Sequence, residues 1–117
     1  MKAKEIAENL RKSRRPWIKG RLYRPGKGYC VLGIKAVEHG VSRSLLGSLN
    51  LDVDYGGVDD LFMLNDNCSS KQELIGRLLE EPNRVFPVER FIKRLLALQK
   101  SVQKRKENSK QKEATQK

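Results

Sequence analysis

The sequence predicts one compact, mainly α-helical domain of α+β type, with four to five helices and one short β-hairpin. Two observations favour this fold class. Apolar residues recur every three or four positions over most of the chain, and a cluster of turn residues near position 25 separates two short runs of strand-forming side chains. The length of 117 residues suits a single core.

Residues 3–13 are expected to form the first helix, because Ala3, Ile6, Ala7 and Leu10 fall on one stripe. A basic stretch follows, and Pro16 ends any helix before it. Trp17 is then placed to cap the core on the same side as the stripe.

A hairpin is predicted around Pro25–Gly28, lying against helices since a two-stranded ribbon alone is only marginally stable. From Tyr29 to Gly40 the apolar spacing becomes helical. Gly33 lies inside this helix, where glycine costs about 1 kcal/mol relative to alanine. We therefore expect a close neighbour there, and Trp17 is the predicted one.

The middle of the chain is predicted to hold a short helix that begins at Ser42, followed by an acidic loop over residues 50–60. Residues 61–64 are predicted to form a buried run. Residues 65–67, with the sequence Asn-Asp-Asn, are predicted to form a turn, because short polar side chains bond their own backbone.

Two helices are predicted to complete the fold. Ser70 and Glu73 have the spacing of a capping box, and the helix they open closes before Pro82. Pro87 suits the first turn of the last helix, which is expected to run to about Arg105. The compact domain is thus predicted to span residues 1–102, and residues 103–117 are predicted to be a disordered basic tail.

Neither a signal sequence nor an apolar run long enough to cross a membrane is visible, so a soluble, cytoplasmic protein is expected. Cys30 and Cys68 are predicted to be free thiols, and no metal or other cofactor is expected. His39 lies nine residues after Cys30, on the opposite helix face. A calcium-binding loop starting at Asp52 is not predicted, because its twelfth position, where a bidentate glutamate is needed, is Met63.

Catalysis finds little support in the sequence. The one candidate nucleophile is Cys30, whose thiolate a helix N-terminus would favour, but His39 faces away from it. A small buried apolar role for Cys30 is preferred. No spacing selects a metal-dependent set from the acidic residues Asp52, Asp54, Asp59, Asp60 and Asp66. We predict that the protein is not an enzyme.

Charge is the main functional signal. The net charge is +11, and it divides into +8 for residues 1–28, −5 for residues 29–89 and +8 for residues 90–117. Basic ends favour contact with the phosphate backbone of a nucleic acid, without a defined target sequence. The predicted contact residues are Arg11, Lys12, Arg14, Arg15, Lys19, Arg21, Arg24, Lys27, Arg90, Lys93, Arg94, Lys104, Arg105 and Lys106.

Three alternatives stay open. The basic ends can fold back on the acidic middle, or serve solubility alone. The last helix, apolar on one side and basic on the other, can pair with a second copy, giving a homodimer in place of a monomer, or dock on an acidic protein, as a phage-type inhibitor would. Trp17 and Tyr23 can stack on bases, although a core role for Trp17 is preferred.

Several short motifs resemble those of a family of small proteins of unknown function from bacteria and their phages. The shared features are Trp-x-x-Gly, Cys-x-x-Gly opening a helix, and Asn-Asp before another helix. The matching positions are Trp17, Gly20, Cys30, Gly33, Asn65 and Asp66. The resemblance covers residues 5–80 and implies a compact, mostly helical domain without bringing an activity. The longer basic C-terminal helix departs from it.

Overall fold

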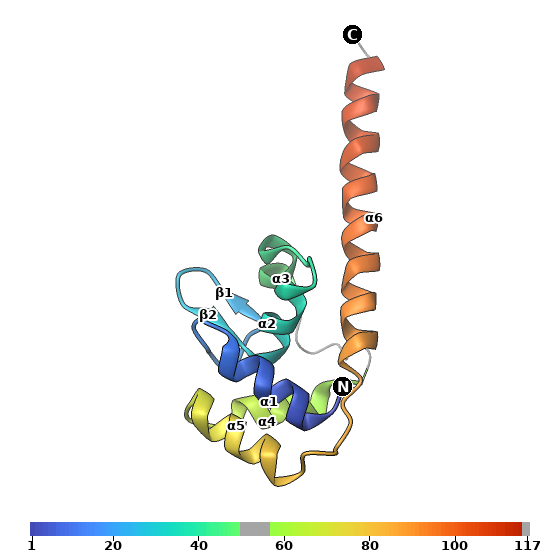
Figure 1. Cartoon of the computed structure of the whole chain (residues 1–117). Helices are drawn as coiled ribbons and strands as arrows, with labels where there is room; N and C mark the ends of the chain where they lie inside the picture. The colour runs from blue at the N-terminus through green and yellow to red at the C-terminus, as the bar shows by residue number, and fades with distance from the viewer. Residues whose placement is uncertain (50–56, 116–117) are drawn as a thin grey trace.

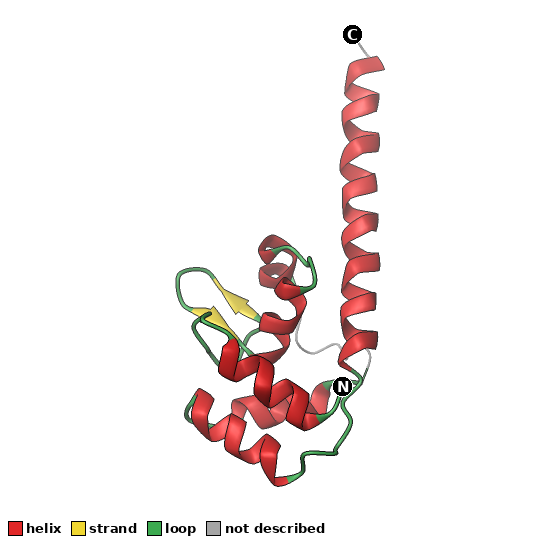
Figure 2. Ribbon diagram, viewed as in Figure 1, coloured by secondary structure: helices red, strands yellow, loops and turns green. Residues whose placement is uncertain are grey.

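Helix α2 (Val31–Glu38) is the central element of the structure, because its residues from Val31 to Ala36 are all buried. It packs against the hairpin, α4 and α6. The structure is a computed structural model that describes residues 1–49 and 57–115, with side chains up to Val102. In these ranges it contains six helices and one two-stranded sheet, which form one globule with a projecting last helix (Figures 1 and 2).

Helix α1 (Ala3–Lys12) and helix α5 (Lys71–Glu80) pack against each other. The predicted stripe of α1 is buried, and Leu74 and Leu78 of α5 are buried as well. The C-terminal end of α1 is held by the Lys71 ammonium, which donates to the Ser13 carbonyl at 2.7 Å.

The first turn of α1 has no side-chain cap, and its free N–H groups are satisfied by a distant segment. The Ala3 and Lys4 amides donate to the carbonyls of Arg84 (2.8 Å) and Pro82 (3.0 Å). Lys2 also forms an isolated antiparallel bridge with Val85. The connection between α5 and α6 therefore closes the globule by completing the N-terminus of α1.

The predicted hairpin is present but short. Strand β1 (Tyr23–Arg24) pairs antiparallel with β2 (Gly28–Tyr29), with Tyr23 opposite Tyr29 and Arg24 opposite Gly28. The Lys27 amide donates to the Arg24 carbonyl at 3.0 Å and closes the turn. Gly26 lies in this turn with φ of 74°, a conformation that suits glycine.

Gly33 does need a close neighbour, but the predicted neighbour, Trp17, is wrong. An added Cβ at Gly33 would lie 1.9 Å from the Leu22 carbonyl oxygen. The backbone that leads into β1 thus rests directly on α2, and only a residue without a side chain permits this approach. The sequence periodicity predicts that a neighbouring group lies close to Gly33, but it does not identify the segment that makes this contact.

Helix α3 (Arg43–Ser48) and α5 begin as predicted. The Ser42 hydroxyl accepts from the Leu45 amide at 3.2 Å. The Ser70 hydroxyl accepts from the Glu73 amide at 3.1 Å. The Glu73 carboxylate reaches one residue further back than a capping box predicts, accepting from the Ser69 amide at 2.9 Å.

Helix α4 (Asp59–Asp66) was not predicted. The sequence indicated a buried run at 61–64 and a turn at 65–67, and the turn is wrong because Asn65 and Asp66 are helical. Helix α4 also raises the helix count above the predicted four to five. Leu61 and Asn65, one helical turn apart, are its buried residues, whereas Met63 is 60% exposed. The sequence does not show the apolar periodicity of a helix here, because a polar residue, Asn65, occupies the core-facing side of α4. The predicted acidic loop covered residues 50–60. Its residues 59–60 belong to α4, and residues 50–56 lie outside the described residues.

Helix α6 (Val88–Thr115) is longer than predicted. It continues past Arg105 through a stretch without Gly or Pro that is rich in Lys, Glu and Gln, which have high helix propensity. Leu98 and Val102 extend its core-facing spacing but are 41% and 39% exposed, because α6 has left the globule there (Figure 1). That residues 103–117 act as a separate tail stays a prediction.

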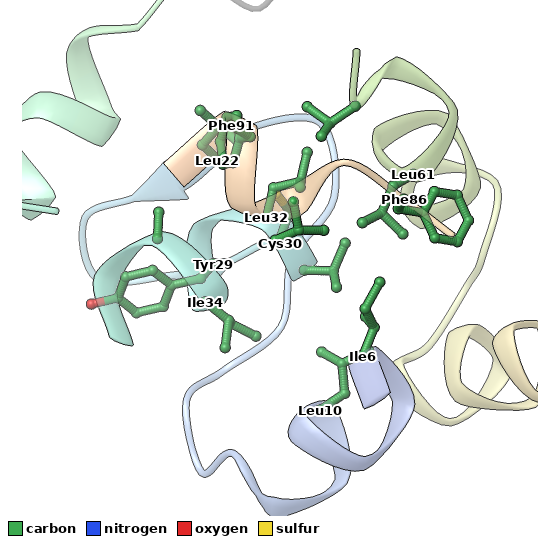
Figure 3. Close-up of a cluster of buried hydrophobic side chains, with 14 of the residues drawn as sticks. Ile6, Leu10, Leu22, Tyr29, Cys30, Leu32, Ile34, Leu61, Phe86 and Phe91 are labelled. Carbon is green, nitrogen blue, oxygen red and sulfur yellow. The ribbon is translucent and has the colours of Figure 1, made fainter. Parts of the chain in front are cut away.

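One continuous core joins these elements. Figure 3 shows side chains from α1, the hairpin, α2, α4 and the start of α6 meeting in a single cluster. Cys30 lies among them and, like Cys68, is a buried free thiol, as predicted.

The contact between Gly33 and Leu22 gives a direct test. Gly33→Ala should destabilise the protein by about 3 kcal/mol, because backbone atoms must move to admit the methyl group. Gly76 on α5 is the matched control, since it also lies within a helix and a Cβ there would meet nothing within 4 Å. Gly76→Ala should stabilise by about 0.5 to 1 kcal/mol. Urea unfolding measures both, and equal effects would contradict the close approach.

Candidate nucleic-acid interface

The buried side-chain amide of Asn65 joins the loop at Trp17 to the first turn of α2. The Asn65 Oδ1 atom accepts from the Trp17 indole at 2.7 Å and from the Val31 amide at 3.0 Å. The Asn65 Nδ2 group donates to the Ile18 carbonyl at 3.1 Å. Next to it, the Asp66 carboxylate accepts from the Gly20 amide at 2.7 Å. Asn65 and Asp66 therefore fix the loop after α1 onto the N-terminus of α2.

This arrangement gives Trp17 a structural role, as preferred from sequence. Its indole is half-buried, packs against the core cluster and is already hydrogen-bonded. Tyr23 is also half-buried, and its ring lies against that of Tyr29 with centroids 4.8 Å apart. Neither aromatic ring is presented as a free stacking platform.

Cys30 caps α2 instead of acting as an exposed nucleophile. Its sulfur accepts from the Gly33 amide at 3.5 Å. Burial raises the pKa of the Cys30 thiol to about 12, and the hydrogen bond from Gly33 offsets this only in part. A thiol with this pKa carries almost no thiolate at neutral pH. His39 lies exposed at the other end of α2, where its Nδ1 is 2.8 Å from the Lys35 carbonyl.

The loop after α1 runs alongside the hairpin as a third extended segment. The Tyr29 amide donates to the Pro16 carbonyl at 2.8 Å, and the Ile18 amide donates to the Tyr29 carbonyl at 2.9 Å. Tyr29 is therefore flanked by Trp17 on one side and by Tyr23 on the other. Three segments that are separate in the sequence form one small layer.

Six of the predicted contact residues extend from this layer and its flanks, and we call them the hairpin cations. All six are exposed. They are Arg14, Arg15, Lys19, Arg21, Arg24 and Lys27. The Arg15 guanidinium lies 5.5 Å from the centre of the Tyr29 ring, which places it over the layer. All six cations lie on the segment between the end of α1 and the start of β2.

Among the described residues, none of the hairpin cations forms an ion pair. Ion pairs lie elsewhere: Arg84 with Asp60 and Glu81, Arg77 with Glu73, Lys35 with Glu38, and Arg11 with Glu8. In the part that the structure describes, the acids of the middle thus pair mainly with basic residues of the middle, and Glu89 pairs with the Met1 ammonium at 3.0 Å. No Lys or Arg side chain of residues 1–28 forms an ion pair with those acids among the described residues.

The other predicted contact residues are not part of this layer. Arg11 and Lys12 lie on the last turn of α1, and Arg11 is partly neutralised by Glu8 at 2.9 Å. Arg90, Lys93 and Arg94 are exposed on α6. Helix α6 packs on α2 while α3 lies next to β1, and Figure 1 shows α6 and the hairpin on different sides of α2 and α3.

The side chains of Lys104, Arg105 and Lys106 lie outside the described residues, although their backbone is helical. Among described residues no three His, Cys, Asp or Glu side chains are grouped to hold a metal ion. No helix in that part of the chain is long and apolar enough to span a membrane. Asp52 and Asp54, considered above for calcium, lie in the segment that is not described.

Comparison with protein-family models, with curated proteins and with solved structures finds no match. The resemblance to small bacterial and phage proteins therefore stays a prediction, and function rests on the geometry.

Asn65 can be tested by removing its amide. Asn65→Ala should destabilise the protein by about 3 kcal/mol, because it leaves the Trp17 indole, the Val31 amide and the Ile18 carbonyl without their partner. Unfolding in urea, followed by fluorescence of the single tryptophan, measures this. Asn67→Ala, at an exposed position next to the helix end, should change stability by less than about 0.5 kcal/mol. A loss below about 1 kcal/mol for Asn65→Ala would contradict the role assigned to the amide.

Proposed function

We propose that this protein is a non-enzymatic binding protein that contacts the phosphate backbone of a nucleic acid. The observation that carries the proposal is the set of six exposed hairpin cations without an acidic partner among the described residues. Phosphate contact releases counterions from the nucleic acid, and an unpaired cation gains the full benefit of this. A cation already bound to a carboxylate gains less.

The fixed backbone of the layer favours this role. The segments that carry the hairpin cations are held by hydrogen bonds to Tyr29, Asn65 and Asp66, so the side chains move on an ordered support. Phosphate contacts of this kind position a protein on the backbone without reading bases. The proposal accordingly names no target sequence.

The buried Cys30 thiol and the exposed His39 give no nucleophile and base within reach of each other, which favours binding over catalysis. A different surface, on α6, favours the alternative function, which is docking on an acidic protein.

Neutralising three hairpin cations tests the proposed interface. Arg21→Gln, Arg24→Gln and Lys27→Gln together should weaken binding to a labelled duplex, and the log-log dependence of affinity on salt should become shallower by about 2 to 3 units, since each lost contact removes about 0.9. Fluorescence anisotropy between about 50 and 200 mM salt measures both quantities.

A matched control removes the same number of positive charges elsewhere. Lys4→Gln, Arg77→Gln and Arg84→Gln change Lys4 on α1 and two arginines that already pair with acids. This variant should keep most of the affinity and slope. Equal weakening in both variants would show that net charge alone attracts the nucleic acid, and absence of binding to both a single strand and a duplex at low salt would overturn the proposal.

Truncation after Val102 tests the contribution of the distal part of α6. Stability should change by less than about 0.5 kcal/mol, because the packing of α6 against the core ends at Leu96 among the described residues. Binding should weaken, because Lys104, Arg105 and Lys106 are lost. Urea unfolding and the same anisotropy assay separate the two effects, and unchanged binding would remove this segment from the interface.

A further inference from the structure

An apolar groove runs along α6 on the side next to the C-terminal end of α2. It has a volume of about 480 Å³, and its lining includes Ile92, Leu96, Ala97 and the ring of His39. The α6 residues in its wall recur every three or four positions, so one helix face forms the groove. This face adjoins the stripe that packs on the core and is not covered by any described segment.

The groove has a fixed shape. Ile92 is buried and Leu96 is half-buried against the core, so the floor belongs to the globule. Gln99, one turn further along α6, accepts from the Ser42 amide at 2.7 Å and donates to the Gly40 carbonyl at 3.1 Å. These two bonds tie α6 to the connection after α2. The wall containing His39 is held by the contact of its Nδ1 with the Lys35 carbonyl.

The rim of the groove is basic. Lys93 and Lys100 line it, both are exposed, and neither forms an ion pair among the described residues. They lie two helical turns apart, about 10 Å along the axis. The groove also contains one acid, Glu89, whose carboxylate is 3.0 Å from the terminal ammonium of Met1. The unpaired charge at the rim is therefore positive.

We propose that this groove docks an acidic amphipathic helix of a partner protein. An apolar side chain of the partner would occupy the space over Leu96 and Ala97, and two carboxylates seven residues apart would meet Lys93 and Lys100. The recognition resembles other cases in which one helix lays its apolar face into a groove. The proposal does not rest on nucleic-acid binding, because the hairpin cations do not line the groove.

Charge decides among the occupants. A second copy would bring its own α6 beside this one, and residues 90–117 carry a net charge of +8. Such a pair is repelled over its whole length. A phosphate backbone matches the two lysines but gains nothing from an apolar floor. An acidic helix with apolar residues on one side satisfies both features.

The test uses a fluorescein-labelled, stapled helical peptide of about 15 residues, with glutamates seven positions apart and a leucine midway between them. It should bind the full-length protein in an anisotropy titration and shift the amide NMR signals of Lys93, Leu96, Ala97 and Lys100. A peptide with serine in place of leucine, and one with lysines in place of glutamates, should each bind at least about tenfold more weakly.

Protein variants locate the site. Lys93→Glu with Lys100→Glu should reduce peptide binding at least about tenfold, whereas Arg90→Glu with Arg94→Glu, the same charge change at exposed arginines that do not line the groove, should change it by less than about twofold. Leu96→Ser should act like the first pair and Leu98→Ser, at an exposed leucine outside the groove, like the second. Leu96 also packs against the core, so Leu96→Ser can unfold the protein. In that case the result for the Lys93 and Lys100 variant decides the test.

Four outcomes would overturn the inference. They are no peptide binding at about 1 mM, binding that the groove variants leave unchanged, a dimer in sedimentation equilibrium that the groove variants dissociate, and displacement of the peptide by an equimolar single strand. Loss of nucleic-acid binding in the hairpin variant, with peptide binding intact, would leave this inference standing.

Discussion

The buried amide of Asn65 holds together segments that are far apart in the sequence. Its oxygen takes two N–H groups and its nitrogen gives one hydrogen bond, so the amide is well satisfied at a position with no solvent exposure. One of these partners, the Val31 amide, belongs to the first turn of α2 and would otherwise lack an acceptor. Since a buried polar group is costly without partners, α4, α2 and the loop at Trp17 must assemble together.

The same loop is held a second time by close backbone approaches. Gly33 admits the Leu22 carbonyl, and Gly28 lies where a Cβ would be 2.3 Å from the Pro16 carbonyl oxygen. Trp17, considered for base stacking, and Cys30, considered as a nucleophile, therefore both act in holding the fold together. The exposed parts of the same loop and hairpin carry the cations that we propose as nucleic-acid contacts.

Two surfaces of different chemistry follow from this architecture. The hairpin cations offer exposed positive charge, which suits the phosphate backbone proposed as their partner. The groove on α6 combines an apolar floor with two lysines, which suits a helix of opposite charge. Among the described residues, four ion pairs of the acidic middle join residues within that middle, and a fifth joins Glu89, which lines the groove, to the Met1 ammonium.

The sequence alone determined the helix stripes, the caps at Ser42 and Ser70, the turn of the hairpin and the segregation of charge, because each depends on residues within a few positions of one another. It missed α4, since the core side of that helix carries Asn65, whose partners lie more than 30 positions away. Only the tertiary structure decided what rests on Gly33 and which face of α6 the described residues leave uncovered. These features depend on contacts between distant segments, and local spacing carries no information about them.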